Sequence, residues 1–351
     1  MSTEREVVCV TGASGCIGSW LVHLLLLRGY SVHATVKNIQ DEKETKHLEA
    51  LEGASTRLHL FEMDLLKYDT VSAAVNGCAG VFHLASPCIV DEVQDPQKQL
   101  LDPAVKGTLN VLTAAKEAGV KRVVVTSSIS AITPSPNWPG DKIKDEECWA
   151  DEDFCKQNGL WYPLSKTLAE KAAWEFAEEK GLDVVVVNPG TVMGPVIPPS
   201  INASMLMLQR LLEGIIFSFV FIHMFELVLS DKSLFEMMYS TGCTETYENF
   251  FMGSVHFKDV ALAHILVYEN PSAKGRHLCV EAISHYGDFV AKVAELYPNY
   301  NVPKLPSETQ PGLLRAKSAA KKLMELGLEF SPMEDIIKDG VESLKSKGII
   351  A

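Results

Sequence analysis

The sequence lacks several features that would place the protein in a specialised class. Its eight cysteines include no Cys-x-x-Cys pair, so we expect reduced thiols in the cytosol and neither a zinc site nor a disulfide scaffold. Acidic residues outnumber basic ones by 45 to 32, and this net charge of −13 argues against a general grip on nucleic acid or an anionic membrane. No apolar stretch reaches the 18 residues that a membrane span needs, and the polar N-terminus is not a secretory signal. We therefore expect a cytoplasmic protein without a bound metal.

What the chain does contain is enough apolar sequence for a large core. Hydrophobic residues make up 47% of the 351 positions and charged residues 22%, which excludes a disordered chain or a fibre. A length of this size suits one large domain or two smaller ones.

Short apolar runs rich in β-branched residues alternate with helical stretches through the first two hundred residues. The runs are 7–10, 32–36, 58–63, 81–85, 123–126 and 184–187, and the helical stretches are 17–28, 103–118 and 162–180. Uninterrupted apolar runs are typical of strands covered on both faces, and a glycine follows each helical stretch as a helix cap would. This pattern predicts an α/β fold with a doubly wound parallel sheet of the Rossmann type.

The pattern becomes irregular and proline-rich after Pro189 and returns at a strand over 254–257 and a helix over 258–269. We therefore expect a Rossmann domain over 1–190 and 254–281. A smaller, discontinuous α+β substrate domain would comprise 191–253 and 282–351. Two late amphipathic helices, over 318–327 and 333–347, are expected to be structural.

The first strand ends in a glycine-rich turn that opens the first helix. Glycines there let the backbone approach a pyrophosphate, whose charge the helix N-terminus favours. The same spacing also occurs in ordinary strand-to-helix turns, but its place on the first strand favours dinucleotide binding. The candidate cofactor-binding residues are Thr11, Gly12, Gly15, Cys16, Ile17 and Gly18.

The end of the second strand indicates which dinucleotide would bind. An acid there would accept a hydrogen bond from a free ribose 2′-hydroxyl, whereas this chain has Lys37, with Lys43 and Lys46 following. NADP(H) is therefore favoured over NAD, unless Lys37 is simply a solvated surface lysine. Asp64 and the adjacent Leu65, after the third strand, are candidates for the adenine end, although an acidic turn residue is nearly as easily structural.

A phenol and an ammonium group lie four residues apart, at Tyr162 and Lys166, in a predicted helix. That spacing places both side chains on one helix face. The fifth strand ends in Ser127 and Ser128, at the carboxyl edge of the sheet where ligands bind in this architecture. A Tyr/Lys pair alone is a weak signal, but together with the glycine turn and the serines it indicates a catalytic site.

These motifs resemble the extended short-chain dehydrogenase/reductases. More narrowly, the stretches 81–87, 165–170 and 255–261 are similar to plant cinnamoyl-CoA reductase-like and dihydroflavonol-reductase-like enzymes. The resemblance implies an NADP(H)-dependent reductase in which Tyr162 is the general acid, Lys166 binds the nicotinamide ribose and Ser128 holds the substrate carbonyl. It also implies that Pro189 backs the nicotinamide and that Ala85 and Ser86 contribute to the cofactor site.

The implied chemistry agrees with simple electrostatics. Hydride delivery to a carbonyl carbon builds negative charge on the oxygen, which needs a donor placed in advance. A lysine cation about 5 Å from a phenol stabilises the ionised phenol by roughly 3 kcal/mol at an effective dielectric constant near 20. We therefore expect Lys166 to help Tyr162 to exchange its proton near neutral pH.

The chain departs from this family in three places. Cinnamoyl-CoA reductases have Asn-Trp-Tyr-Cys-Tyr around the tyrosine, but this chain has Leu-Trp-Tyr-Pro-Leu at 160–164, which leaves an aldehyde or a ketone open as substrate. The asparagine that many short-chain enzymes carry in an active-site helix is absent from 102–107, so water or backbone would complete the proton path. Residues 215–242 interrupt otherwise family-like sequence. We interpret them as a non-native insertion, such as translated intron sequence, with a lid helix as the alternative.

The sequence leaves three alternative functions to be tested. The first is an NADPH-dependent reductase of a phenylpropanoid-type carbonyl, a cinnamoyl-CoA ester or a related aldehyde or ketone, acting on a small molecule as a monomer or dimer. The second is an epimerase or dehydratase on the same fold, which the lack of an acid at 127–130 disfavours. The third is a non-catalytic NADP(H)-binding protein that the insertion has inactivated.

Overall fold

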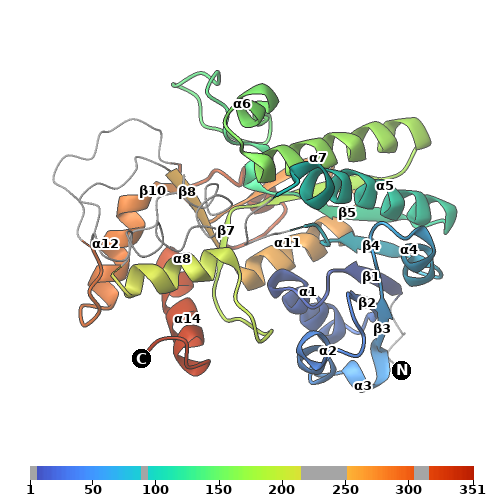
Figure 1. The fold of residues 1–351 in the computed structure, drawn as a ribbon, viewed down its shortest axis with the longest axis horizontal. Coiled ribbons are helices and arrows are strands. Elements are labelled where there is room, and N and C mark those ends of the chain that lie inside the picture. Colours follow the sequence, from blue (N-terminus) through green and yellow to red (C-terminus); the bar gives the residue numbers. More distant parts are fainter. Residues whose placement is uncertain (1–5, 88–93, 215–250, 304–315) are drawn as a thin grey trace.

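The computed structural model describes residues 6–87, 94–214, 251–303 and 316–351 (Figure 1). Its main feature is a seven-stranded sheet in the order β3-β2-β1-β4-β5-β6-β9, in which all neighbours are parallel. The strands are β1 (Val7–Thr11), β2 (Ser31–Val36), β3 (Leu58–Glu62), β4 (Gly80–His83), β5 (Arg122–Thr126), β6 (Val184–Pro189) and β9 (Gly275–Cys279). The doubly wound parallel sheet predicted from the sequence is confirmed.

Helices cover both faces of this sheet (Figure 1). They are α1 (Cys16–Leu27), α2 (Glu42–Glu49), α3 (Ala54–Arg57), α4 (Tyr68–Val75), the π-helical turn η1 (Gln97–Leu101), α5 (Asp102–Glu117), the 3₁₀ turn η2 (Ile129–Ala131), α6 (Glu152–Gln157), α7 (Trp161–Lys180) and α11 (Phe257–Glu269). Helices α1 and α11 pack together on one face, and α4, α5 and α7 pack on the other.

Alternate residues of β1, β4, β5 and β6 enter two separate cores. Val8, Val10 and Val124 belong to the core under α1 and α11, whereas Cys9 and Val123 belong to the core under α4, α5 and α7. Burial on both faces is what an uninterrupted apolar strand requires, since consecutive side chains point to opposite faces. The Val-rich strands were predictable for this reason.

A second sheet gathers segments that are far apart in the sequence. It has the order β10-β8-β7, with β7 (Thr191–Met193), β8 (Phe251–His256) and β10 (Ala282–His285). Helices α8 (Ala203–Leu212), α12 (Tyr286–Leu296), α13 (Lys321–Glu325) and α14 (Met333–Ser346) complete the described chain. Strand β8 runs directly into α11, so this smaller sheet joins the larger one near the carboxyl end of β6. Among the described residues, no helix is both long and apolar enough to cross a membrane.

Topology places ligand binding at one edge of the large sheet. Strand order reverses between β1 and β4, because the chain continues from β1 to β2 and β3 on one side and from β4 to β5 and β6 on the other. Ligands in open α/β sheets bind outside the carboxyl ends of the strands at such a switch point. The side chains that follow β1, β4, β5 and β6 are therefore the candidates for a site.

Candidate active site

The turn after β1 and the start of α1 pack closely, because two glycines there leave no space for a side chain. Gly12 has φ of +67°, and a Cβ there would lie 3.0 Å from Cα of Ala85, while a Cβ on Gly18 would lie 2.2 Å from the carbonyl oxygen of Gly12. Helix α1 begins at Cys16, and within this fully described helix no side chain caps the N-terminus and no acid occupies the first turn. The turn thus offers a close backbone approach and an uncompensated helix dipole, which fits a dinucleotide pyrophosphate.

Thr11 joins the glycine turn to the end of β4. Its hydroxyl oxygen accepts hydrogen bonds from the amides of Leu84 and Ala85, each at 3.0 Å, so its own proton is donated to Nδ1 of His83 at 2.9 Å. His83 then donates from Nε2 to the hydroxyl of Thr108, 3.1 Å away. Burial, with a smaller contribution from Lys166, lowers the pKa of His83 to about 3. His83 is therefore a neutral structural link between β1, β4 and α5.

Lys37 lies exposed in the turn after β2. An acid that the sequence analysis did not single out, Glu44, contacts this turn. The carboxylate of Glu44 in α2 accepts hydrogen bonds from the amide of Lys37 at 2.7 Å and from the amide of Asn38 at 3.5 Å. Glu44 thus accepts from both amide groups that directly follow β2. Its spacing, seven residues after Lys37 in the first turn of α2, was the available signal.

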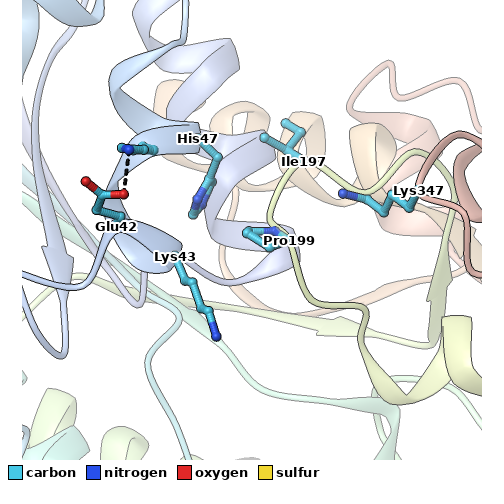
Figure 2. A pocket seen from close by; sticks show the side chains of 7 residues that line it. Glu42, Lys43, His47, Ile197, Pro199 and Lys347 are labelled. Atoms are coloured by element: carbon cyan, nitrogen blue, oxygen red, sulfur yellow. Dashed lines mark ion pairs between the residues drawn. The ribbon is translucent and has the colours of Figure 1, made fainter.

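A solvent-open cavity of about 420 Å³ lies beside the outer face of α2. Figure 2 shows Lys43 and His47 projecting from α2 opposite Ile197 and Pro199, with Lys347 beyond them. Lys46 pairs with Glu42 at 2.5 Å, and Lys347 donates to the carbonyl oxygen of Pro198. Of the lysines that suggested NADP(H), Lys43 and Lys46 both line the open cavity, and Lys46 forms an exposed ion pair with Glu42 of its own helix.

Asp64 and Leu65 lie in the turn between β3 and α4. One carboxylate oxygen of Asp64 accepts a hydrogen bond from the amide of Leu66 at 3.0 Å, which closes an Asx turn, and Lys67 lies 3.6 Å from the other oxygen. The carbonyl oxygen of Leu65 accepts a hydrogen bond from Asn110. Both residues thus have local structural contacts, and their part in binding adenine stays a prediction.

Tyr162 and Lys166 both lie in α7, as their spacing predicted. Nζ of Lys166 lies 5.8 Å from the centroid of the Tyr162 ring, and Lys166 is buried. Pro163 occupies the first turn of α7, where a missing amide proton leaves no helical hydrogen bond unmade. The proline that distinguishes this chain from the family motif is therefore compatible with a helical Tyr162.

Ser128 follows β5 and caps the turn η2. Its hydroxyl oxygen accepts a hydrogen bond from the amide of Ser130 at 3.1 Å, which leaves the hydroxyl proton for another acceptor. Pro189 ends β6 and is buried, and Ala85 and Ser86 follow β4 at half-buried positions. These residues are thus carried by the carboxyl ends of three neighbouring strands, β4, β5 and β6.

A small cavity of about 10 Å³ separates β4 and β5 from α7. Polar residues from several elements line it, namely His83, Thr108, Ser127, Lys166 and Glu170, together with Ala85 and Ser86. Its volume suits about one water molecule. Lys166 therefore faces a polar interior rather than an apolar one.

Sequence reasoning missed Glu170 and Arg276, which form a buried ion pair beside this cavity. Nε of Arg276 in β9 donates to Oε1 of Glu170 at 2.6 Å, and the two side chains are 7% and 0% exposed. Glu170 follows Lys166 by four residues, as Lys166 follows Tyr162, so helical spacing alone placed it on the same face. Arg276 gave a weaker signal, a single arginine in a short strand.

Two further predictions from the sequence concern the suspected insertion and the absence of a metal site. The suspected insertion, 215–242, lies outside the described residues. Within the residues that are described, no group of three or more His, Cys, Asp or Glu side chains is arranged to hold a metal ion.

Comparisons with known proteins agree with this geometry. The model of the family described as the NAD dependent epimerase/dehydratase family matches residues 8–223. Cinnamoyl-CoA reductase 1 of Petunia hybrida is 45% identical over 348 residues, covering 99% of this chain and 94% of the relative. The crystal structure of vestitone reductase from alfalfa (Medicago sativa) has a TM-score of 0.76 and 31% identity, covering 99% of this chain and all of the other. That of yeast methylglyoxal/isovaleraldehyde reductase complexed with NADPH has a TM-score of 0.76 and 26% identity, covering 98% of this chain and all of the other.

Proposed function

Because the chain belongs to the NAD dependent epimerase/dehydratase family, we propose that it is an NADPH-dependent reductase. Its substrate would be the carbonyl of a phenylpropanoid-type compound, a cinnamoyl-CoA ester or a related aldehyde or ketone. The similarity to a cinnamoyl-CoA reductase over nearly the whole chain supports the substrate class, and the NADPH complex of a structural neighbour supports the cofactor.

The glycine turn would hold the pyrophosphate of the cofactor. Gly12, Gly15 and Gly18 permit the close approach, and the amides at the start of α1, around Cys16 and Ile17, would face the phosphates. Lys37 would pair with the 2′-phosphate, with Lys43 nearby. Asp64 and Leu65 would flank the adenine, while Thr11 holds the 84–86 segment in place for Ala85 and Ser86 to line the nicotinamide half.

The catalytic roles follow from where charge changes during reduction. Bound NADPH supplies a hydride for the carbonyl carbon. As negative charge grows on the carbonyl oxygen, the hydroxyl of Ser128 would donate a hydrogen bond to it and Tyr162 would transfer its phenolic proton. The Lys166 cation, 5.8 Å from the ring centroid, stabilises the phenolate that remains and would also bind the nicotinamide ribose. Pro189 would form the wall behind the nicotinamide.

We propose the domain division expected from the sequence as the functional one. Residues 1–190 and 254–281 would bind the cofactor, and residues 191–253 and 282–351 would form the substrate side. The second sheet, built from segments on either side of α11, supports a substrate unit that folds back onto the end of β6.

The observation that carries this proposal is the juxtaposition of Lys166 and Tyr162 on α7, with Lys166 lining the same small cavity as Ala85, against which Gly12 of the glycine turn packs. It is tested by following NADPH oxidation with cinnamoyl-CoA, cinnamaldehyde, phenylacetaldehyde and dihydroflavonols, using the full chain and a chain lacking 215–242. We expect turnover with at least one phenylpropanoid carbonyl. NADPH binding without turnover in either chain would instead support the non-catalytic alternative.

A further inference from the structure

The groups proposed to act on the carbonyl lie on separate elements that must be held in register. Tyr162 and Lys166 are carried by α7, Ser128 follows β5, and Pro189 ends β6. Productive geometry requires such groups to be held within about 0.5 Å of their places, which side chains on independent elements do not achieve without a link between them.

Glu170 lies on α7 and is hydrogen-bonded to a residue next to Ser128 and to a residue next to Pro189. Its Oε2 accepts hydrogen bonds from the hydroxyl of Ser127 at 2.5 Å and from Nδ2 of Asn188 at 2.9 Å, and its Oε1 accepts from Arg276. Ser127 adjoins Ser128, and Asn188 adjoins Pro189. The same Nδ2 of Asn188 also donates to the carbonyl oxygen of Ser128, 3.2 Å away. One carboxylate on the Tyr162–Lys166 helix therefore connects to the side chains of the residues that adjoin Ser128 and Pro189.

Arg276 extends this link to the loop that follows Ser128. Its guanidinium donates to the carbonyl oxygens of Ala131, Glu146 and Cys148, and it stacks on the ring of Trp149 at 3.8 Å. A planar guanidinium suits this role, since its donors point in fixed directions and its face can stack. The ion pair thus joins α7 and β9 to both ends of the 131–149 loop.

We propose that Glu170 is a positioning residue, whose buried carboxylate sets the place of Ser128 and Pro189 relative to Tyr162 and Lys166. This inference rests on the proposed reductase function. Every group around the carboxylate is a donor, and a glutamine of the same shape has only one acceptor oxygen, so Glu170→Gln leaves donors unpaired on one side. The substitution therefore disturbs position while changing volume little.

The chain offers a matched control at the opposite edge of the sheet. Arg122, also 7% exposed, pairs with Asp183 at 2.8 Å and donates to the carbonyl oxygens of Val267 and Asn270. Asp183→Asn is the same carboxylate-to-amide change beside a buried arginine, but Asp183 is 47% exposed and lies at the amino ends of β5 and β6. It should leave turnover within twofold of wild type.

The test compares wild type, Glu170→Gln and Asp183→Asn as full chains, with cinnamoyl-CoA or whichever carbonyl gives turnover. For Glu170→Gln we expect kcat to fall at least tenfold and the isotope effect with [4,4-²H₂]NADPH to rise, while the Kd for NADPH stays within threefold. A loss of kcat no greater than that of Asp183→Asn would overturn the inference. If Glu170→Gln does not fold, Ser127→Ala replaces it, with a threefold loss of kcat expected and an unchanged kcat contradicting us.

Two further readouts separate this inference from the proposed function. Crystal structures of wild type and Glu170→Gln should differ by more than about 0.5 Å in the distance between Oγ of Ser128 and Oη of Tyr162, and an unchanged distance would overturn the positioning role. Turnover that survives Glu170→Gln but not Tyr162→Phe would overturn this inference alone. Turnover that survives Tyr162→Phe would overturn the proposed function instead.

Discussion

Polar residues at the amino ends of the strands in the seven-stranded sheet (the amino edge) differ in burial from those at the carboxyl ends (the carboxyl edge). At the amino edge, Glu6 and Lys121 pair at exposed positions and Asp183 is about half exposed, although its partner Arg122 is buried and also donates to two backbone carbonyl oxygens. At the carboxyl edge, the polar groups of His83, Glu170 and Asn188 are buried and held by several hydrogen bonds each. Exposed pairs contribute little to stability, whereas buried polar groups are costly unless each is satisfied.

Buried, hydrogen-bonded polar groups at the carboxyl edge are what the proposed catalytic role of that edge requires. Its hydrogen bonds hold Glu170 and Asn188 in one arrangement, although Oδ1 of Asn188 has no hydrogen-bond partner among the described residues. Substitutions of similar residues at the two edges test whether only the carboxyl edge takes part in catalysis.

The largest effect is expected from the two tyrosines. Tyr162→Phe at the carboxyl edge should lower kcat by a factor of about 100 or more, because it removes the proton donor, and should leave NADPH affinity nearly unchanged. Tyr268→Phe removes a phenol whose hydroxyl contacts Glu6 at the amino edge, and should leave kcat unchanged. Steady-state NADPH oxidation measures both. Turnover retained by Tyr162→Phe would remove the role assigned to that phenol.

Reversing the charge of an exposed lysine should matter only at the cofactor edge. Lys37→Asp should weaken NADPH binding by about 30-fold and leave NADH binding largely as it is, since two unit charges change beside the 2′-phosphate. Lys121→Asp, at the amino edge, should change neither Kd. Fluorescence titration with both cofactors gives the answer, and an unchanged preference in Lys37→Asp would show that this lysine is merely a solvated surface residue.

Removing the charge of Glu44, whose carboxylate binds the turn that carries Lys37, should change NADPH affinity in the opposite direction and by less. Glu44→Gln should tighten NADPH binding by about fivefold, because one negative charge near the 2′-phosphate is lost. Glu42→Gln, on the same helix but paired with Lys46, is the matched control. Equal NADPH affinities in wild type and Glu44→Gln would mean that Glu44 moves away from the bound cofactor.

The last prediction concerns stability in acid rather than activity or cofactor affinity. Burial lowers the pKa of His83 to about 3, so the unfolded chain takes up a proton below pH 6.5 that the folded chain does not. The free energy of unfolding should therefore fall as the pH drops from 6.5 toward 3, by up to about 1.4 kcal/mol per pH unit from this residue. Urea unfolding of wild type and His83→Asn at pH 7, 6 and 5 measures it, and equal slopes would contradict the assignment.

Much of the fold was predictable because each strand of the Rossmann sheet except β9 is an apolar run, and a glycine follows α1, α5 and α7 shortly after each ends. Gly181, for example, adopts φ of +62° directly after α7. Strand β9 was not individually predicted, since Arg276 and His277 interrupt its apolar pattern. The glycine turn, Tyr162 and Lys166 were visible because local spacing defines them. The ion pair between Glu170 and Arg276 was not, because its partners lie 106 residues apart and meet only in the folded protein.

Isotope labelling directly tests whether NADPH bound at the carboxyl edge transfers a hydride to a carbonyl carbon. The full chain is incubated with [4,4-²H₂]NADPH and cinnamaldehyde or cinnamoyl-CoA, and the product is examined by mass spectrometry and NMR. We predict one deuterium per turnover on the former carbonyl carbon. Product without deuterium at that carbon, or NADPH that binds and is never oxidised, would contradict the account.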